Sequence, residues 1–140
     1  MRPWPFFVVL LVACEASSGE PQTPVAGKDY RIELSQPKTA TSGNPATCEL
    51  TVTPSGPWKL KAETPFSATL TPGPGLRVEK SKLDNKDFVD AAAPAKAVRT
   101  GCTAEGAGEK TLKASLTFFL CSAEICKRMQ EQVTASLKVN

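Results

Sequence analysis

Apolar and polar residues alternate with a period of two through most of this chain. The longest alternation places Leu112, Ala114, Leu116, Phe118 and Leu120 on one side of an extended segment. Such a pattern is typical of β-strands that bury one face in a core and expose the other to water. Shorter alternations of the same kind cover residues 30–34, 46–52, 66–70, 98–102 and 133–139.

Turn-forming sequences separate these segments. Clusters of Gly, Pro, Ser and Glu occupy residues 54–57, 72–75 and 105–108, and such clusters favour tight turns. About seven short strands joined by turns predict an all-β fold, an immunoglobulin-like antiparallel β-sandwich. Residues 81–97 fit this pattern poorly and are compatible with a loop, an edge strand or a single helical turn. The segment 123–132 is the best candidate for one short helical turn.

The N-terminal segment has the features of an export signal. Arg2 is the only charged residue before Glu15, and an apolar run covers residues 4–13. This run is shorter than the roughly 20 residues that a membrane-spanning helix needs, and it fits a signal peptide. An ordinary secretory signal, with a cysteine near the cleavage point by chance, is the alternative to the more specific interpretation that follows.

The residues Leu11-Val12-Ala13-Cys14 resemble the lipobox of bacterial lipoprotein signal peptides. The resemblance implies cleavage before Cys14 and attachment of lipid to that cysteine, which would hold the protein on a membrane and facing the periplasm. Glu15, rather than Asp, favours the outer membrane. We therefore expect a removed signal peptide at 1–13, a lipidated flexible tether at 14–27 and the β-sandwich domain at 28–140.

Composition excludes several classes of function. The chain has no histidine, which rules out Ser-His-Asp and Cys-His catalysis and any His-ligated metal site. Loss of Arg2 with the signal peptide lowers the 17 basic residues to 16, against 14 acidic residues, so that the net charge is +2. So small a charge argues against nucleic acid as a partner. We expect no cofactor and no metal.

Five cysteines are present, and four remain when Cys14 is assigned to the lipid. An even number of cysteines in an exported chain favours disulfide bonds. Cys48 and Cys102 each lie on the apolar face of a predicted strand, so we expect both to point into the core and to form a structural disulfide across the sandwich. Two separate buried thiols are the alternative.

The other two cysteines, Cys121 and Cys126, differ from this pair. Cys121 follows the longest strand, on the face opposite its apolar residues, so a metal site made of all four thiolates is not favoured. A bond between residues five apart requires a tight loop rather than a helix. Lys127 and Arg128 follow at once, and nearby cations favour the reactive thiolate. We therefore expect Cys126 to be the attacking thiol of this pair.

The stretch from Phe118 to Cys126, followed by a strand at 133–139, resembles the end of the N-terminal periplasmic domain of the DsbD family of thiol:disulfide interchange proteins. The resemblance implies an immunoglobulin-like fold. It also implies that Cys121 and Cys126 form a catalytic redox pair that exchanges electrons with periplasmic thiol proteins. The sequence does not reveal the loop that covers the pair in that family.

Two functional hypotheses follow. In the first, the protein is a membrane-anchored thiol–disulfide exchange module that uses its Cys-x4-Cys pair. In the second, it is a non-enzymatic structural or binding lipoprotein in which both disulfides are structural.

Overall fold

Two five-stranded sheets pack face to face in the computed structural model, which describes residues 25–36 and 39–140. The first sheet has the order β1 (Val25–Ala26), β2 (Tyr30–Ser35), β4 (Pro45–Pro54), β8 (Lys96–Ala104), β6 (Leu76–Val78). The second has the order β3 (Thr39–Ala40), β10 (Cys126–Val139), β9 (Gly108–Cys121), β5 (Ser67–Pro72), β7 (Lys82–Asp84). Neighbouring strands are antiparallel, except that β3 pairs parallel with β10. The fold is the all-β, immunoglobulin-like sandwich that the alternation predicts.

The core lies between the sheets and is built by the alternating residues of the long strands. Phe118 and Leu120 of β9 are fully buried, as are Ile32 of β2 and Val98 of β8. Tyr30 packs edge-on against Phe118, with 5.4 Å between the ring centroids, and its hydroxyl donates a hydrogen bond to Glu131 of β10. This contact joins the two sheets at the side where β2 and β10 approach each other.

Two details differ from the sequence-based expectations, and the alternatives left open for residues 81–97 are resolved. The helical turn expected at 123–132 is wrong, because β10 begins at Cys126 and each of its residues pairs with one of β9. The ambiguous segment 81–97 contains the edge strand β7 and a 3-10 turn, η1 (Asn85–Asp87). The part of the chain that the structure describes has ten strands rather than about seven, since four are edge strands of two or three residues.

The N-terminal predictions fall largely on residues outside the described part. The signal peptide, Cys14 and most of the 14–27 tether lie there. Val25 and Ala26, at the end of that tether, form β1 and pair with β2. No helix among the described residues is long and apolar enough to cross a membrane.

A disulfide joins Cys48 to Cys102, with 5.9 Å between their Cα atoms. Both residues are buried in the core, as expected. The expectation that the bond crosses the sandwich is wrong. Cys48 is on β4 and Cys102 on the adjacent β8, where Cys48 lies opposite Thr100, so the bond runs diagonally within the first sheet.

Replacing Cys48 and Cys102 together by Ala should lower the free energy of unfolding by roughly 4 kcal/mol, because the bond closes a long loop in the unfolded chain. Replacing Cys121 and Cys126 together by Ser should cost about 2 kcal/mol or less, because that loop is short. Urea denaturation followed by Trp58 fluorescence measures both, in chains that lack the signal peptide. Equal losses in the two double variants would contradict this assignment.

Candidate functional site

The second disulfide joins Cys121 at the end of β9 to Cys126 at the start of β10, with 4.0 Å between the Cα atoms. The two cysteines lie directly opposite each other in the register of the hairpin. The backbone N–H and carbonyl of Cys121 point away from Cys126 and towards Lys59. The Cys121 N–H donates to the Lys59 carbonyl at 2.9 Å, and the Cys121 carbonyl accepts from the Lys59 N–H at 2.8 Å. The two cysteines therefore form a non-hydrogen-bonded pair, the type in which opposite side chains come closest.

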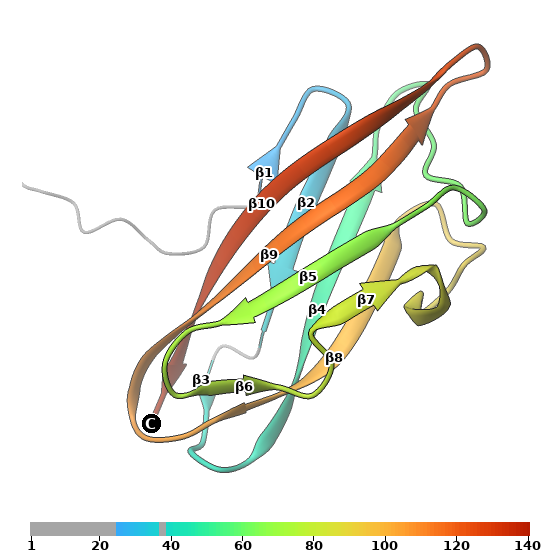
Figure 1. The fold of residues 1–140 in the computed structure, drawn as a ribbon. Coiled ribbons are helices and arrows are strands. Elements are labelled where there is room, and N and C mark those ends of the chain that lie inside the picture. The colour runs from blue at the N-terminus through green and yellow to red at the C-terminus, as the bar shows by residue number, and fades with distance from the viewer. Residues whose placement is uncertain (1–24, 37–38) are drawn as a thin grey trace, which may run out of the picture.

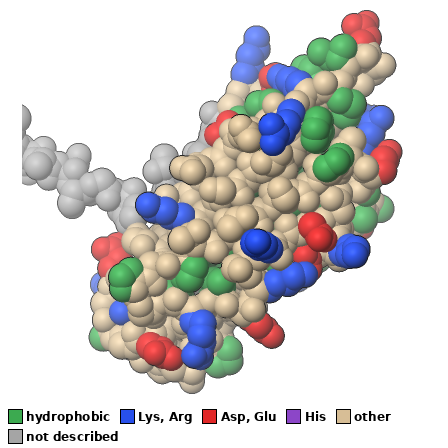
Figure 2. Space-filling view, viewed as in Figure 1, with side chains coloured by type: hydrophobic (Ala, Val, Ile, Leu, Met, Phe, Trp, Pro, Cys, Tyr) green, Lys and Arg blue, Asp and Glu red, His purple; other side chains and the backbone are tan. Residues whose placement is uncertain are grey.

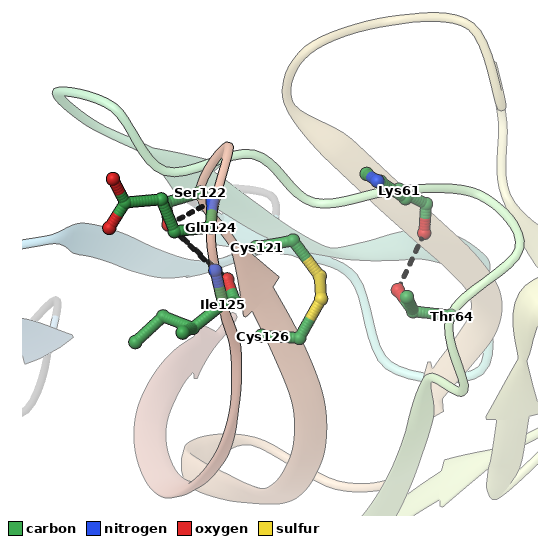
Figure 3. Close-up of a disulfide and its surroundings, with 7 residues drawn as sticks. All are labelled: Lys61, Thr64, Cys121, Ser122, Glu124, Ile125 and Cys126. Carbon is green, nitrogen blue, oxygen red and sulfur yellow. Dashed lines mark hydrogen bonds between the residues drawn. A yellow bond between two sulfur atoms is a disulfide. The ribbon is translucent and has the colours of Figure 1, made fainter.

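Ser122 organises the turn between the two cysteines. Its backbone N–H donates to the Ile125 carbonyl at 2.7 Å. Its hydroxyl oxygen accepts from the backbone N–H groups of Glu124 and Ile125, each at 3.2 Å (Figure 3). A side chain that satisfies backbone donors in this way fixes a turn without glycine. The loop between the cysteines is therefore ordered and presents Ile125 outward.

The two cysteines differ sharply in exposure. Cys121 is 1% exposed, whereas Cys126 is exposed. Cys121 shares the strand face of Phe119, opposite the core-facing Phe118 and Leu120, and it is absent from the hydrophobic core cluster. The bond therefore links a covered cysteine to an accessible one outside the core.

The segment 58–66 lies against Cys121 on the side away from β10. Lys59 makes the two backbone hydrogen bonds already described, and Figure 3 draws Lys61 and Thr64 among the surroundings of the disulfide. Asn85 of η1 fastens the far end of this segment. Its amide donates to the carbonyls of Ala62 and Thr64 and accepts from the N–H of Phe66, all at 2.8 Å. All three hydrogen bonds hold in place the segment that pairs with Cys121 through Lys59.

The cations after Cys126 divide between the two faces of β10. Arg128 lies on the same face as Cys126 and is exposed. Lys127 points to the opposite face, where its ammonium lies 2.6 Å from a carboxylate oxygen of Asp29 and 4.1 Å from the ring centroid of Trp58. Arg128 is thus the cation on the strand face of Cys126, and the expectation that Lys127 activates the Cys126 thiol directly is not supported by this geometry.

Trp58 is half-buried and packs against the edge of the core while it stacks on Lys127. Lys127 holds the pKa of Asp29 below its usual value, mainly through the hydrogen bond between them, and Trp58 adds a weaker hydrogen bond that acts in the same direction. Asp29 therefore stays ionised at neutral pH, and the ion pair persists there.

An exposed hydrophobic side chain lies in the turn between the two cysteines. In Figure 1 the β9–β10 turn forms the upper right tip of the ribbon, and Figure 2 shows hydrophobic side chains among charged ones at the same end. Ile125, in the turn itself, is 60% exposed, and the other large hydrophobic residue exposed in the described part, Val89, lies outside the hairpin. An exposed apolar side chain next to an accessible sulfur suits contact with another protein.

A metal site finds no support in the described residues. No group of three or more His, Cys, Asp or Glu side chains is placed to hold a metal ion there. The four cysteines of the domain are joined in two disulfides, which indicates an oxidising compartment outside the cytoplasm.

Sequence reasoning missed three residues that build this site. Asp29, Lys59 and Asn85 act through partners between 19 and 98 residues away in the chain. No periodic pattern or local spacing marks such contacts.

The comparisons with known proteins identify a class of fold. No family model and no curated protein matches the chain. Among solved structures it is similar to native alpha-2-macroglobulin of Escherichia coli, with a TM-score of 0.52, 16% identity and 79% of this chain covered. A second structure of that protein, from domain MG7 to the C-terminus, gives a TM-score of 0.51, 15% identity and 86% coverage. This chain spans 7% and 17% of the lengths of those two chains. The likeness places the domain among immunoglobulin-like β-sandwiches.

Proposed function

We propose that this protein is a lipid-anchored thiol–disulfide exchange module that acts through Cys121 and Cys126. The observation that carries the proposal is the asymmetry of this bond, which joins the accessible Cys126 to the buried Cys121 outside the hydrophobic core. A disulfide exchanges when a thiolate can reach one of its sulfurs and the other sulfur can leave.

The exchange runs in two steps. A thiolate of a partner dithiol protein attacks the Cys126 sulfur, a new bond joins partner to Cys126, and Cys121 leaves as a thiolate. The second partner thiolate then attacks the partner's own sulfur in this mixed disulfide, so that Cys126 is released. The partner becomes a disulfide, and the Cys121–Cys126 pair gains two electrons. In the reverse direction Cys126 attacks a partner disulfide, and Cys121 attacks Cys126 to release the partner.

The hairpin supports this role because it has little need of a covalent bond. Fourteen consecutive pairs join β9 to β10, and the inward-facing residues are buried from Leu112 to Leu120 in β9 and from Val133 to Val139 in β10. The resemblance of the Phe118–Cys126 region to the DsbD family points to the same chemistry. The competing hypothesis, a structural or binding lipoprotein, draws support from the burial of Cys121, since an inert structural bond also has a covered sulfur.

The reduction potential of the Cys121–Cys126 pair tests the exchange function. The chain without residues 1–14 is equilibrated in glutathione buffers, and the state of each bond is read by alkylation and mass spectrometry. We expect a potential well above about −300 mV with Cys48–Cys102 still intact, as is typical of exchanging rather than structural bonds. A potential below that value, or unfolding when the bond opens, would favour the structural alternative.

The anchor is tested separately with the full chain expressed in a bacterium. The lipobox resemblance predicts that the mature protein partitions into the detergent phase of a Triton X-114 extract and that Cys14→Ser moves it to the aqueous phase. Cys126→Ser serves as the matched control and should remain in the detergent phase. Aqueous partitioning of the unaltered protein would overturn the anchor and leave the exchange hypothesis intact.

A further inference from the structure

The two strand ends that carry the cysteines are supported unequally. At Cys121, β9 is flanked on one side by β10 and on the other by Lys59. At Cys126, β10 has β9 on one side, and on its other side β3 pairs only with Lys138 and Val139. Across the described residues, no strand therefore pairs with the outer edge of β10 from Cys126 to Val133, although Tyr30 of β2 contacts Glu131 there. When the disulfide opens, backbone pairing alone holds Cys126 less firmly than Cys121.

Side chains supply the missing support. Lys127, next to Cys126, reaches Asp29 in the turn between β1 and β2, so its ion pair ties the end of β10 to the first sheet. The same ammonium lies over Trp58, the residue before Lys59. We call Lys127, Asp29 and Trp58 the Lys127 latch. The Lys127 and Asp29 side chains are 34% and 28% exposed, so the pair is less screened by water than a fully exposed one.

A second contact fixes β10 four residues further along. Tyr30, the neighbour of Asp29, donates its hydroxyl hydrogen bond to Glu131. Glu131 helps raise the pKa of Tyr30 to about 12, second in effect to burial, so the donor proton is retained at neutral pH. The first half of β10 is thus held at two residues, Lys127 and Glu131, by the neighbouring residues Asp29 and Tyr30, where β2 begins. Of the two contacts, that of Lys127 is the nearer to Cys126.

We propose that the Lys127 latch holds Cys126 beside Cys121 after the disulfide opens and so favours closure of the bond. Lys127 is then a positioning residue. It affects disulfide formation because it fixes the position of the β10 strand end, and not because its positive charge stabilises the thiolate. The proposal builds on the exchange function and adds to it a determinant of the redox equilibrium. The reaction concerned is oxidation of the dithiol by glutathione disulfide, which yields the protein disulfide and two glutathione molecules.

The test uses the full-length chain with Cys14→Ser, so that Cys14 contributes no thiol. The equilibrium constant for closure of the Cys121–Cys126 bond against glutathione is measured in this parent, in Lys127→Met and in Asp29→Asn. Each variant should lower the constant roughly two- to fivefold, the effect of losing a partly exposed ion pair. The double variant should lower it no further than the stronger single one, because both changes remove the same contact. Lys80→Met, which breaks the Lys80–Asp87 pair of 2.7 Å outside the hairpin, is the matched control and should leave the constant unchanged.

The direction of the change separates the latch from a simple charge effect. If Lys127 acted only by stabilising a thiolate, Lys127→Met would raise the closure constant and Asp29→Asn would lower it. A rise or no change in Lys127→Met, or an equal shift in Lys80→Met, would overturn the proposal. A parent potential below about −300 mV together with a lower constant in both latch variants would instead refute the exchange function and keep the latch.

Discussion

Pairing between β9 and β10 governs the whole site, because it sets Cys121 opposite Cys126 in a non-hydrogen-bonded pair. A slip of one residue would turn one strand's cysteine to the other face and part the sulfurs. The same slip would expose the apolar residues that both strands bury, so the core itself enforces the register. The disulfide thus results from the fold more than it maintains it, which supports the proposal that it serves exchange.

The two cysteines inherit different environments from the strands that carry them. β9 lies inside its sheet and has the segment 58–66 beside its end, so Cys121 is covered and fixed on both sides. β10 forms the edge of its sheet at the hairpin end, so Cys126 is accessible and depends on the Lys127 latch for its position. One fixed, covered thiol beside one accessible, tethered thiol is an arrangement suited to attack from outside and closure from within.

The alternation of apolar and polar residues predicted the sandwich and the inward orientation of Cys48 and Cys102. It could do so because burial of one strand face requires apolar residues at every second position of a short sequence segment. It failed for 123–132, where hairpin pairing with the preceding strand β9 makes residues 126–132 a strand although they show no clear alternation. It also did not reveal that Cys48 and Cys102 sit on adjacent strands, since face does not specify strand order. The position of Lys127 next to Cys126 in the sequence suggested that its charge acts on the Cys126 thiol. In the strand, however, neighbouring side chains point to opposite faces, and Lys127 instead pairs with Asp29.

The central claim is that Cys126 is the point of attack, and the first mixed disulfide tests it most directly. The chain without residues 1–14 is treated briefly with reduced glutathione, the reaction is stopped with acid, and the glutathione adduct is located by peptide mass spectrometry. The account predicts an adduct on Cys126, with Cys121 free and Cys48–Cys102 intact. An adduct on Cys121, or opening of Cys48–Cys102 before the hairpin bond, would contradict it.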